Sequence, residues 1–430
     1  MTCMVHPAAV PRSLAEPPTY SLDGAFWSDL QREYWRKKPG CFRQPFREPI
    51  AAPQEVMRAL HAANQRVAAR SLSYKLLVGD RELRARWEEW TPRPEDTSLS
   101  AYTERLKPKL GADRFGVFIK DFQLELGWDF WRRMRQFVRQ VYGFAGVPSL
   151  NAEVDLFVGN YEMTLNGIHI DFADVFYFVT EGTKRMRLWP YEVFRGNPPK
   201  MALKDYAQYI PQSTLLEANA GDLLYWPASY WHVAESDGEP ASSLSLALYY
   251  QHSILSHADR LLTAELSGTR PELFKRPSVA FDDARMPREL EHLCDLVERK
   301  PRALRLRERA TEMWLKRLTG LGFDAVPPPT RTEEIPPGER LRADPEFPAL
   351  FKRVHDELIL SANGLSLSLP YHPDLPKVLR RVNSGAPFSP EELSLQFVAP
   401  SRGRKGPRLS PRALTKLLIT LKSYRAIEAV

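Results

Sequence analysis

A histidine and an aspartate lie two residues apart in the stretch 167–176, GIHIDFADVF, among β-branched and aromatic residues. Successive side chains of a strand point to opposite faces, so His169 and Asp171 are expected to share one face. A carboxylate among buried apolar side chains is costly unless a cation or hydrogen bonds compensate it. An ordinary histidine–aspartate hydrogen bond near a strand end would meet this need, and so would a metal ion.

A second histidine is a candidate for a further metal ligand. The segment 221–236, GDLLYWPASYWHVAES, predicts a turn, a short strand and a break at Pro227 before His232. The sequence between Asp171 and His232 is long enough for the chain to form further strands and bring His232 back beside Asp171. Two histidines and one carboxylate form the facial triad of mononuclear non-haem Fe(II) oxygenases, which leaves positions open for co-substrate and oxygen. The alternative is a loop histidine without a ligand role.

A lysine follows on the next expected strand. Lys184 comes after a Glu-Gly turn and begins the run KRMRLWP, which should return beside the strand that carries His169. A buried ammonium favours an anionic partner, so Lys184 could bind a dicarboxylate whose other end chelates the metal. Because Arg185 and Arg187 are its neighbours, a basic exposed strand is the alternative.

The elements that must position these residues change character along the sequence. To about residue 150, amphipathic helical patterns dominate, at 28–39, 53–72 and 128–144. From 152 to about 250, short β-rich runs alternate with turn residues. Many short strands with helices to one side predict an α+β protein built on a jelly-roll or barrel.

The C-terminal part is expected to be separate. A second helical stretch is predicted from about 252 to 322, and a proline-rich linker follows at 326–340. Three short helices should then begin near Leu375, Pro390 and Pro411, with the basic loop APSRGRKGPR before the last. This arrangement suits a helix-turn-helix or winged-helix module.

Charge is concentrated in that C-terminal part. The formal net charge of the protein is +7, and the segment from Lys377 to the end holds eleven basic and three acidic residues. A strongly basic segment favours a polyanionic partner, most simply nucleic acid or the ribosome. A solvated basic surface is the alternative.

Composition places the protein among soluble globular proteins. It has no run of eighteen apolar residues, and prolines and an acid interrupt the N-terminus where a signal peptide needs an apolar core. A cytoplasmic protein without membrane contact is therefore expected. Cys3, Cys41 and Cys294 are too widely spaced to indicate a disulfide framework or a cysteine zinc site, so histidine and carboxylate must hold any metal.

Taken together, these motifs resemble one family. HxDxxDVF at 169–176, Lys184, a strand ending in LWP and GDxLYxPxxxxHxxE at 221–235 are similar to the JmjC-type, cupin-like 2-oxoglutarate oxygenases. The likeness is closest to the ribosomal-oxygenase branch, whose aromatic and basic lead-in the segment 26–46 resembles. The order of elements fits along nearly the whole sequence, although only about 155–250 carries specific motifs.

The resemblance implies a division into domains and a site. It implies a JmjC oxygenase domain with a helical lead-in at 1–252, a helical dimerisation region and linker at 253–345, and a basic winged-helix-like domain at 346–430. By the same resemblance His169, Asp171 and His232 ligate Fe(II), and Lys184 binds the far carboxylate of 2-oxoglutarate.

The sequence departs from the branch at two positions before the first histidine. Asp155 and Phe157 stand where the branch usually has Asn and Tyr, which contact the co-substrate or line its pocket. Thr164, Asn166 and Ser245 are the polar candidates that could supply the missing hydrogen bonds. Six further residues are candidates for lining the substrate site: Tyr161, Tyr177, Arg187, Trp226, Tyr230 and Trp231.

The activity implied is hydroxylation of a C–H bond in a side chain of a protein or peptide, with release of succinate and CO2. A ribosomal protein or a peptide natural-product precursor would be the substrate, and the protein would be a homodimer. Two alternatives stay open. One is an oxygenase that acts on a small metabolite or an N-methylated residue, and the other is a nucleic-acid-binding regulator with a sensory cupin.

Overall fold

The structure is a computed structural model with two compact units, Met1–Gln251 and His252–Val430. It describes residues 22, 24–68, 74–79, 81–83, 89–111, 113–161, 164, 167–196, 205–250, 305–398 and 409–430. Most of the expected dimerisation region, Asn166 and the basic loop at 399–408 lie outside these residues. Each unit is described by itself.

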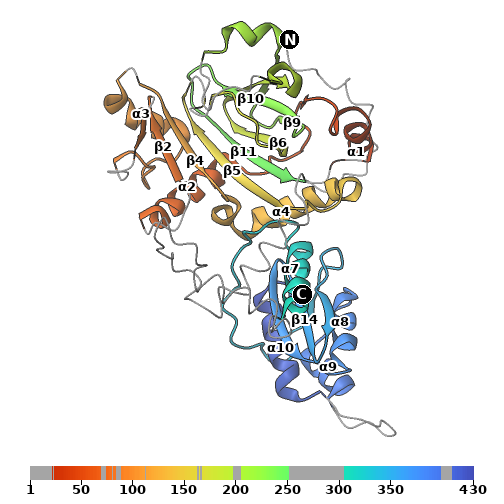
Figure 1. The fold of residues 1–430 in the computed structure, drawn as a ribbon. Coiled ribbons are helices and arrows are strands. Elements are labelled where there is room, and N and C mark those ends of the chain that lie inside the picture. Colours follow the sequence, from red (N-terminus) through yellow and green to blue (C-terminus); the bar gives the residue numbers. More distant parts are fainter. Residues whose placement is uncertain are drawn as a thin grey trace, which may run out of the picture. The chain divides into compact units, whose positions relative to one another are not determined.

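Two antiparallel sheets form the centre of the first unit (Figure 1). The larger sheet has eight strands, in spatial order β1 (Gly40–Phe42), β9 (Leu223–Trp226), β6 (Asp174–Glu181), β11 (Ala241–Tyr249), β5 (Asn151–Gly159), β4 (Phe115–Ile119), β2 (Tyr74–Val78) and β3 (Arg81–Leu83). The smaller sheet has the order β10 (Tyr230–Glu235), β7 (Thr183–Pro190) and β8 (Thr214–Asn219). The predicted jelly-roll is thus confirmed as a cupin-like fold, and the sequence analysis missed β1 to β4.

Alternation along the strands sorts side chains between the two faces. On β7, Lys184, Met186 and Leu188 are buried and face the interior between the sheets, whereas Arg185 and Arg187 point the other way. The interior core also contains Tyr177 of β6 and Trp226 of β9. On β7, only the residues that alternate with Lys184 on the inner face can contribute side chains to a site between the sheets.

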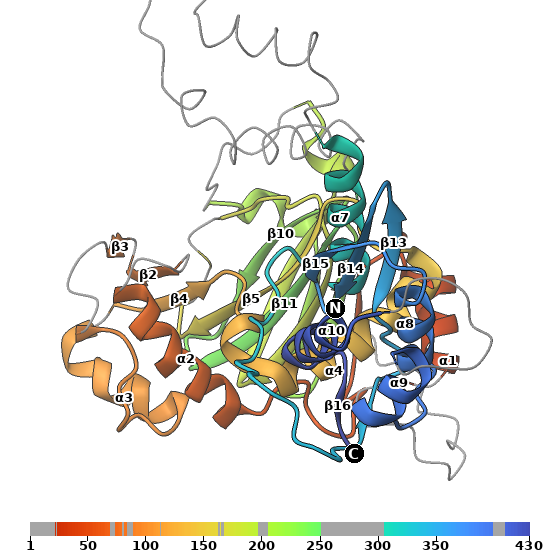
Figure 2. The same ribbon diagram turned by 90° about the horizontal axis from the view of Figure 1, so that it is seen from below.

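Helices flank the larger sheet. They are α1 (Gly24–Asp29), which continues as a π-helical turn to Tyr34, α2 (Pro53–Ala68), α3 (Leu99–Leu110) and α4 (Gln123–Ala145). Helix α4 buries the apolar stripe that its sequence predicts and contacts β5 and α2 (Figure 2). The helix expected at 28–39 ends early, because the backbone turns at Trp35 to enter β1.

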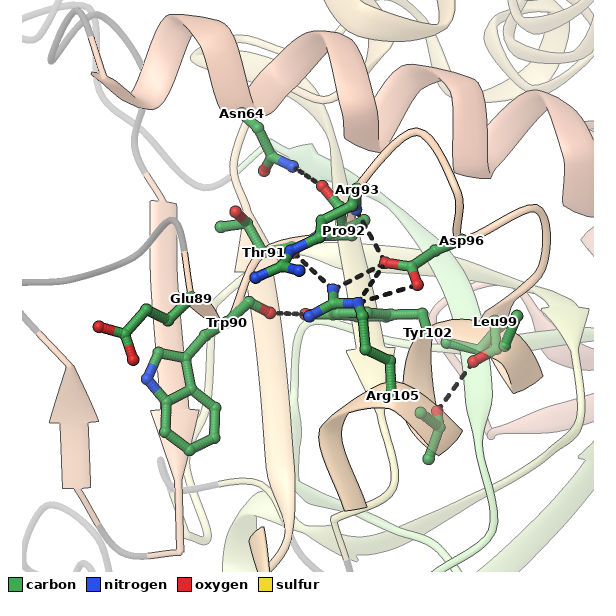
Figure 3. A network of polar contacts seen from close by, with 12 residues as sticks. Asn64, Glu89, Trp90, Thr91, Pro92, Arg93, Asp96, Leu99, Tyr102 and Arg105 are labelled. Atoms are coloured by element: carbon green, nitrogen blue, oxygen red, sulfur yellow. Dashed lines mark hydrogen bonds and ion pairs between the residues drawn. The ribbon is translucent and has the colours of Figure 1, made fainter. Parts of the chain in front are cut away.

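A polar network anchors the segment before α3 (Figure 3). The Arg105 guanidinium donates to both carboxylate oxygens of Asp96 and to the Thr91 carbonyl. The Tyr102 hydroxyl donates to the Trp90 carbonyl, and the Asn64 amide of α2 donates to the Pro92 carbonyl. These side chains thus form hydrogen bonds with backbone carbonyls of an irregular segment, in place of the bonds that a helix or sheet would provide.

Cys41 is buried on β1, where its Sγ lies 3.5 Å from the Glu217 carbonyl oxygen. Cys3 and Cys294 lie outside the described residues.

The second unit has its own core. Helix α7 (Leu306–Thr319) packs on a three-stranded antiparallel sheet of β13 (Leu350–Val354), β14 (Glu357–Ala362) and β15 (Leu365–Pro370). The helices α8 (Leu375–Asn383), α9 (Pro390–Phe397) and α10 (Pro411–Ser423) begin where the sequence predicts, and the short strands β12 (Leu341–Arg342) and β16 (Glu428–Ala429) pair. The sheet was not foreseen. Among the described residues, no helix is long and apolar enough to cross a membrane.

Candidate metal centre

The two histidines of the motif face each other directly. His169 and His232 form a β-bridge in which each backbone N–H donates to the other's carbonyl, at 3.0 and 2.8 Å. The strand expected over 167–176 begins only at Asp174, so Asp171 lies in the connection that precedes β6. The bridge ties this connection to β10, which the local sequence pattern could not reveal.

The three side chains meet at one point. His232 Nε2 lies 3.3 Å and His169 Nε2 lies 3.7 Å from a carboxylate oxygen of Asp171. One ligand atom from each residue falls within 4.8 Å of the others. The Nδ1 of His169 lies 2.9 Å from the Gly167 carbonyl, so a proton on Nδ1 leaves the Nε2 lone pair free for a metal. The arrangement has the spacing of a three-ligand facial site.

Electrostatics prepare this site for a cation. Burial, followed by the neighbouring imidazole of His232, lowers the pKa of His169 to about 4. Burial alone would raise the pKa of Asp171, but the hydrogen bond and charge of His232, with the charge of His169, bring it down to about 2. Near neutral pH His169 is therefore neutral and Asp171 is ionised, which are the forms that bind metals.

Lys184 is buried and forms no ion pair with an acidic side chain in the described part of the protein, although the charge of Asp237 acts on it and raises its pKa. Its side chain is 1% exposed, and its Nζ donates to the Tyr161 hydroxyl at 2.7 Å. Burial lowers the pKa of Lys184 to about 7. On the same side of the interior, the Ser243 hydroxyl donates to the Tyr177 hydroxyl. A group with negative charge would relieve the desolvation of this ammonium.

The other predicted residues divide between the two faces of the sheets. The centroid of the Trp226 ring lies 5.2 Å from that of the His232 ring and 5.6 Å from that of the Tyr177 ring. Tyr230 packs at the margin of the interior core. In contrast, Arg187 pairs with Glu235 on the opposite face of β7, and Trp231 belongs to an outer apolar cluster. The structure thus separates these last two side chains from the site.

Polar candidates occupy different places. Ser245 lies opposite Asp155 of β5 and Tyr177 of β6 in register, on the inner face. The backbone N–H of Thr164 donates to the Ala234 carbonyl, while the Thr164 hydroxyl is buried. Phe157 packs beside Tyr177, at 6.1 Å between ring centroids.

The sequence analysis singled out Asp155 but missed Glu153, which lies on the same strand, β5. Glu153 lies two residues before Asp155 on β5, accepts a hydrogen bond from the Tyr249 hydroxyl at 2.8 Å and pairs with Lys120 at 2.9 Å. Burial, followed by the charge of Glu153, raises the pKa of Asp155 well above its ordinary value. Alternation in the run NAEVDLFVG was the available signal, since it puts Glu153, Asp155 and Phe157 on one face.

Comparisons with known proteins agree with the motif. Residues 123–255 match the family model of the JmjC domain, whereas no curated protein matches the sequence. The solved structure described as the X-ray structure of E. coli ycfD shares 16% identity and has a TM-score of 0.50, covering 95% of this protein and 99% of that one. Another, described as a ribosomal oxygenase from Escherichia coli in complex with cobalt and 2-oxoglutarate, has a TM-score of 0.44 and 16% identity, covering 94% and 98%. The resemblance to the JmjC domain is thus confirmed over residues 123–255, and the likeness to the first of these solved structures concerns the fold.

Proposed function

We propose that this protein is an Fe(II)- and 2-oxoglutarate-dependent oxygenase that hydroxylates a C–H bond in a side chain of a protein or peptide. The observation that carries the proposal is the convergence of His169, Asp171 and His232 in the same interior as the buried ammonium of Lys184. A two-histidine, one-carboxylate set suits Fe(II). A dicarboxylate fits between such a metal and a lysine.

The residues of the site have distinct tasks. His169, Asp171 and His232 would hold the iron, and Lys184 would bind the far carboxylate of 2-oxoglutarate, assisted by Ser245, Thr164 and Asn166. When bound, iron and 2-oxoglutarate supply oxygen activation coupled to decarboxylation to succinate and CO2. Trp226 and Tyr177 exclude water from the interior beside the metal ligands. Tyr161 and Tyr177 orient the co-substrate end, because Tyr161 already contacts Lys184.

The substrate and partners belong to the same proposal. A ribosomal protein is the substrate we favour, with a peptide natural-product precursor as a variant, and Tyr230 stands at the margin of the interior to meet it. The second unit is proposed to contain a winged-helix-like domain at 346–430 that contacts ribosome or nucleic acid. The region 253–345 is proposed to form a homodimer. Such a protein would work in the cytoplasm.

The first experiment measures succinate formed from 2-oxoglutarate after oxygen is admitted to protein reconstituted anaerobically with Fe(II). His169→Ala should abolish turnover, and Lys184→Ala should require more 2-oxoglutarate. The matched controls are His355→Ala and Lys107→Ala, whose side chains are 66% and 61% exposed and which should behave as wild type. Since slow turnover without substrate can escape detection, binding of Mn(II) and 2-oxoglutarate is measured in parallel. Failure to bind either would refute the proposal.

A further inference from the structure

A buried carboxylate lies close in sequence to one of the metal ligands but on the other face of the sheet. Asp174 is the first residue of β6, three residues after Asp171, and its side chain is 1% exposed. Because side chains alternate along β6, Asp174 points away from the interior that contains Val175 and Tyr177. Asp174 is therefore not itself a candidate metal ligand.

The carboxylate of Asp174 also holds the segment that leads to His232. Its Oδ1 accepts hydrogen bonds from the Ala228 backbone N–H at 3.4 Å and from the Tyr225 hydroxyl at 3.3 Å. Ala228 lies in the turn between β9 and β10, four residues before His232. One side chain thus connects the segment after Asp171 with the segment before His232.

Arg36 supplies the positive charge that this buried carboxylate needs. The Arg36 Nε donates to Asp174 Oδ2 at 3.0 Å, and the guanidinium lies 4.6 Å from the centroid of the Tyr250 ring. Burial raises the pKa of Asp174, whereas the charge and the hydrogen bond of Arg36 lower it. Removing the arginine would therefore leave a buried charge without its counter-ion.

The backbone at Arg36 has an unusual conformation that permits this contact. Its φ is +55°, in the left-handed region that residues other than glycine seldom adopt. In this conformation the Arg36 backbone N–H donates to the Tyr225 hydroxyl at 2.8 Å, while the side chain reaches Asp174. Trp35 stacks on the Tyr225 ring at 5.6 Å between centroids. Strain of this kind persists only where the surrounding structure fixes it.

A second arginine–aspartate pair holds the opposite end of β9. Arg43, directly after β1, pairs with Asp222, whose side chain is 2% exposed. The Asp222 carboxylate also accepts hydrogen bonds from the backbone N–H groups of Gln44 and Asn219. Asp222 thus resembles Asp174 in burial and pairing, but it holds the turn between β8 and β9 and not the turn before β10.

Resting on the proposed function, we propose that Asp174 is a positioning residue of the metal centre and that Arg36 acts through it. The Asp174 carboxylate fixes the turn at Ala228 relative to the connection that carries Asp171. The side chains of Asp171 and His232 are thereby kept at the spacing that a metal ion requires. Arg36 offsets the cost of burying the charge of Asp174.

The test measures the Kd of Mn(II) for the full-length protein, from the EPR signal of the unbound ion. It uses neither 2-oxoglutarate nor oxygen and therefore does not depend on turnover. Asp174→Ala should raise this Kd by about tenfold or more, as is usual when a residue that orients a metal ligand is lost. Arg36→Ala should raise the Kd as well. Asp174→Asn keeps an oxygen that accepts from the Ala228 N–H, so it should bind Mn(II) more tightly than Asp174→Ala.

The matched control is Asp222→Ala, which removes an equally buried, arginine-paired carboxylate at the other end of β9. It should lower the stability of the metal-free protein in urea about as much as Asp174→Ala does, yet leave the Kd of Mn(II) unchanged. Arg43→Ala is the corresponding control for Arg36→Ala. If Asp174→Ala does not fold, Arg36→Ala and Tyr225→Phe carry the test, because each removes a single partner of the carboxylate.

Two results would overturn the inference. One is a Kd of Mn(II) that stays at the wild-type value when the partners of Asp174 or Asp174 itself are replaced. The other is an equal loss of affinity in Asp222→Ala, which would assign the effect to a general loss of stability. Absence of Mn(II) binding in the wild type would contradict the proposed function itself, and the inference would fall with it.

Discussion

Lys184 is the residue whose charge should control the affinity for the co-substrate. Its pKa is lowered to about 7 by burial, and a bound carboxylate would raise it, so binding takes up a proton. Affinity should be greatest below pH 7 and fall by about tenfold per pH unit above it, until the pKa of the complex is reached. Calorimetry of 2-oxoglutarate binding between pH 6.5 and 8.5, in buffers of different ionisation enthalpy, measures both affinity and proton uptake.

Lys184→Arg is the matched control for this titration. A guanidinium stays charged over the whole range, so the pH dependence due to this position should disappear even if the absolute affinity changes. The carboxylates of 2-oxoglutarate do not titrate there. A wild-type affinity that does not change between pH 6.5 and 8.5 would show that Lys184 is charged before the co-substrate arrives.

The triad should make the first unit more stable when a divalent metal is present. A metal that binds only the folded state stabilises it by about 2.7 kcal/mol at a hundredfold excess over its Kd. Mn(II) should raise the Tm of this unit, and EDTA should reverse the change. In His169→Ala the shift should vanish because two ligands remain, whereas His355→Ala should retain it. An equal shift in all three proteins would place the metal elsewhere.

At the scale of the elements, the stability of the segment before α3 depends on the guanidinium of Arg105. Asp96 is 4% exposed in its side chain and receives both hydrogen bonds and charge from Arg105. Arg105→Ala would leave a buried carboxylate without its cation, which costs about 3–5 kcal/mol of unfolding free energy. Urea denaturation measures this loss. Lys107→Ala on the same helix, with an exposed ion pair, should cost less than about 1 kcal/mol.

The strands show what a sequence can and cannot predict about the site. The two-residue spacing of His169 and Asp171 and the later His232 identified residues that the fold brings together. Alternation from Lys184 already places Arg187 on the opposite face, and alternation from His232 does the same for Trp231. By contrast, the pairing of His169 with His232 is a long-range contact, which no local pattern contains.

The strands β2 to β4 at one side of the larger sheet were not predicted, because their assignment also depends on long-range pairing. β4, the run FGVFI, is a short apolar stretch that local periodicity cannot assign to strand or helix. Its place between β2 and β5 depends on pairing with both neighbours. The position of this flank in the sheet was therefore beyond what local sequence patterns could predict.

At the scale of the whole molecule, each unit buries a core of its own, so the two should unfold in separate transitions. Leu417 is fully buried in the core of the second unit, and Leu417→Ala should lower the stability of that unit by about 2–5 kcal/mol. Val154→Ala, in the first unit, should act on the other transition. Differential scanning calorimetry with and without Mn(II) distinguishes them, because the metal should shift only the transition that Val154→Ala lowers. If either substitution moved both transitions equally, the units would fold as one cooperative body, and the metal centre would depend on the C-terminal core for its stability.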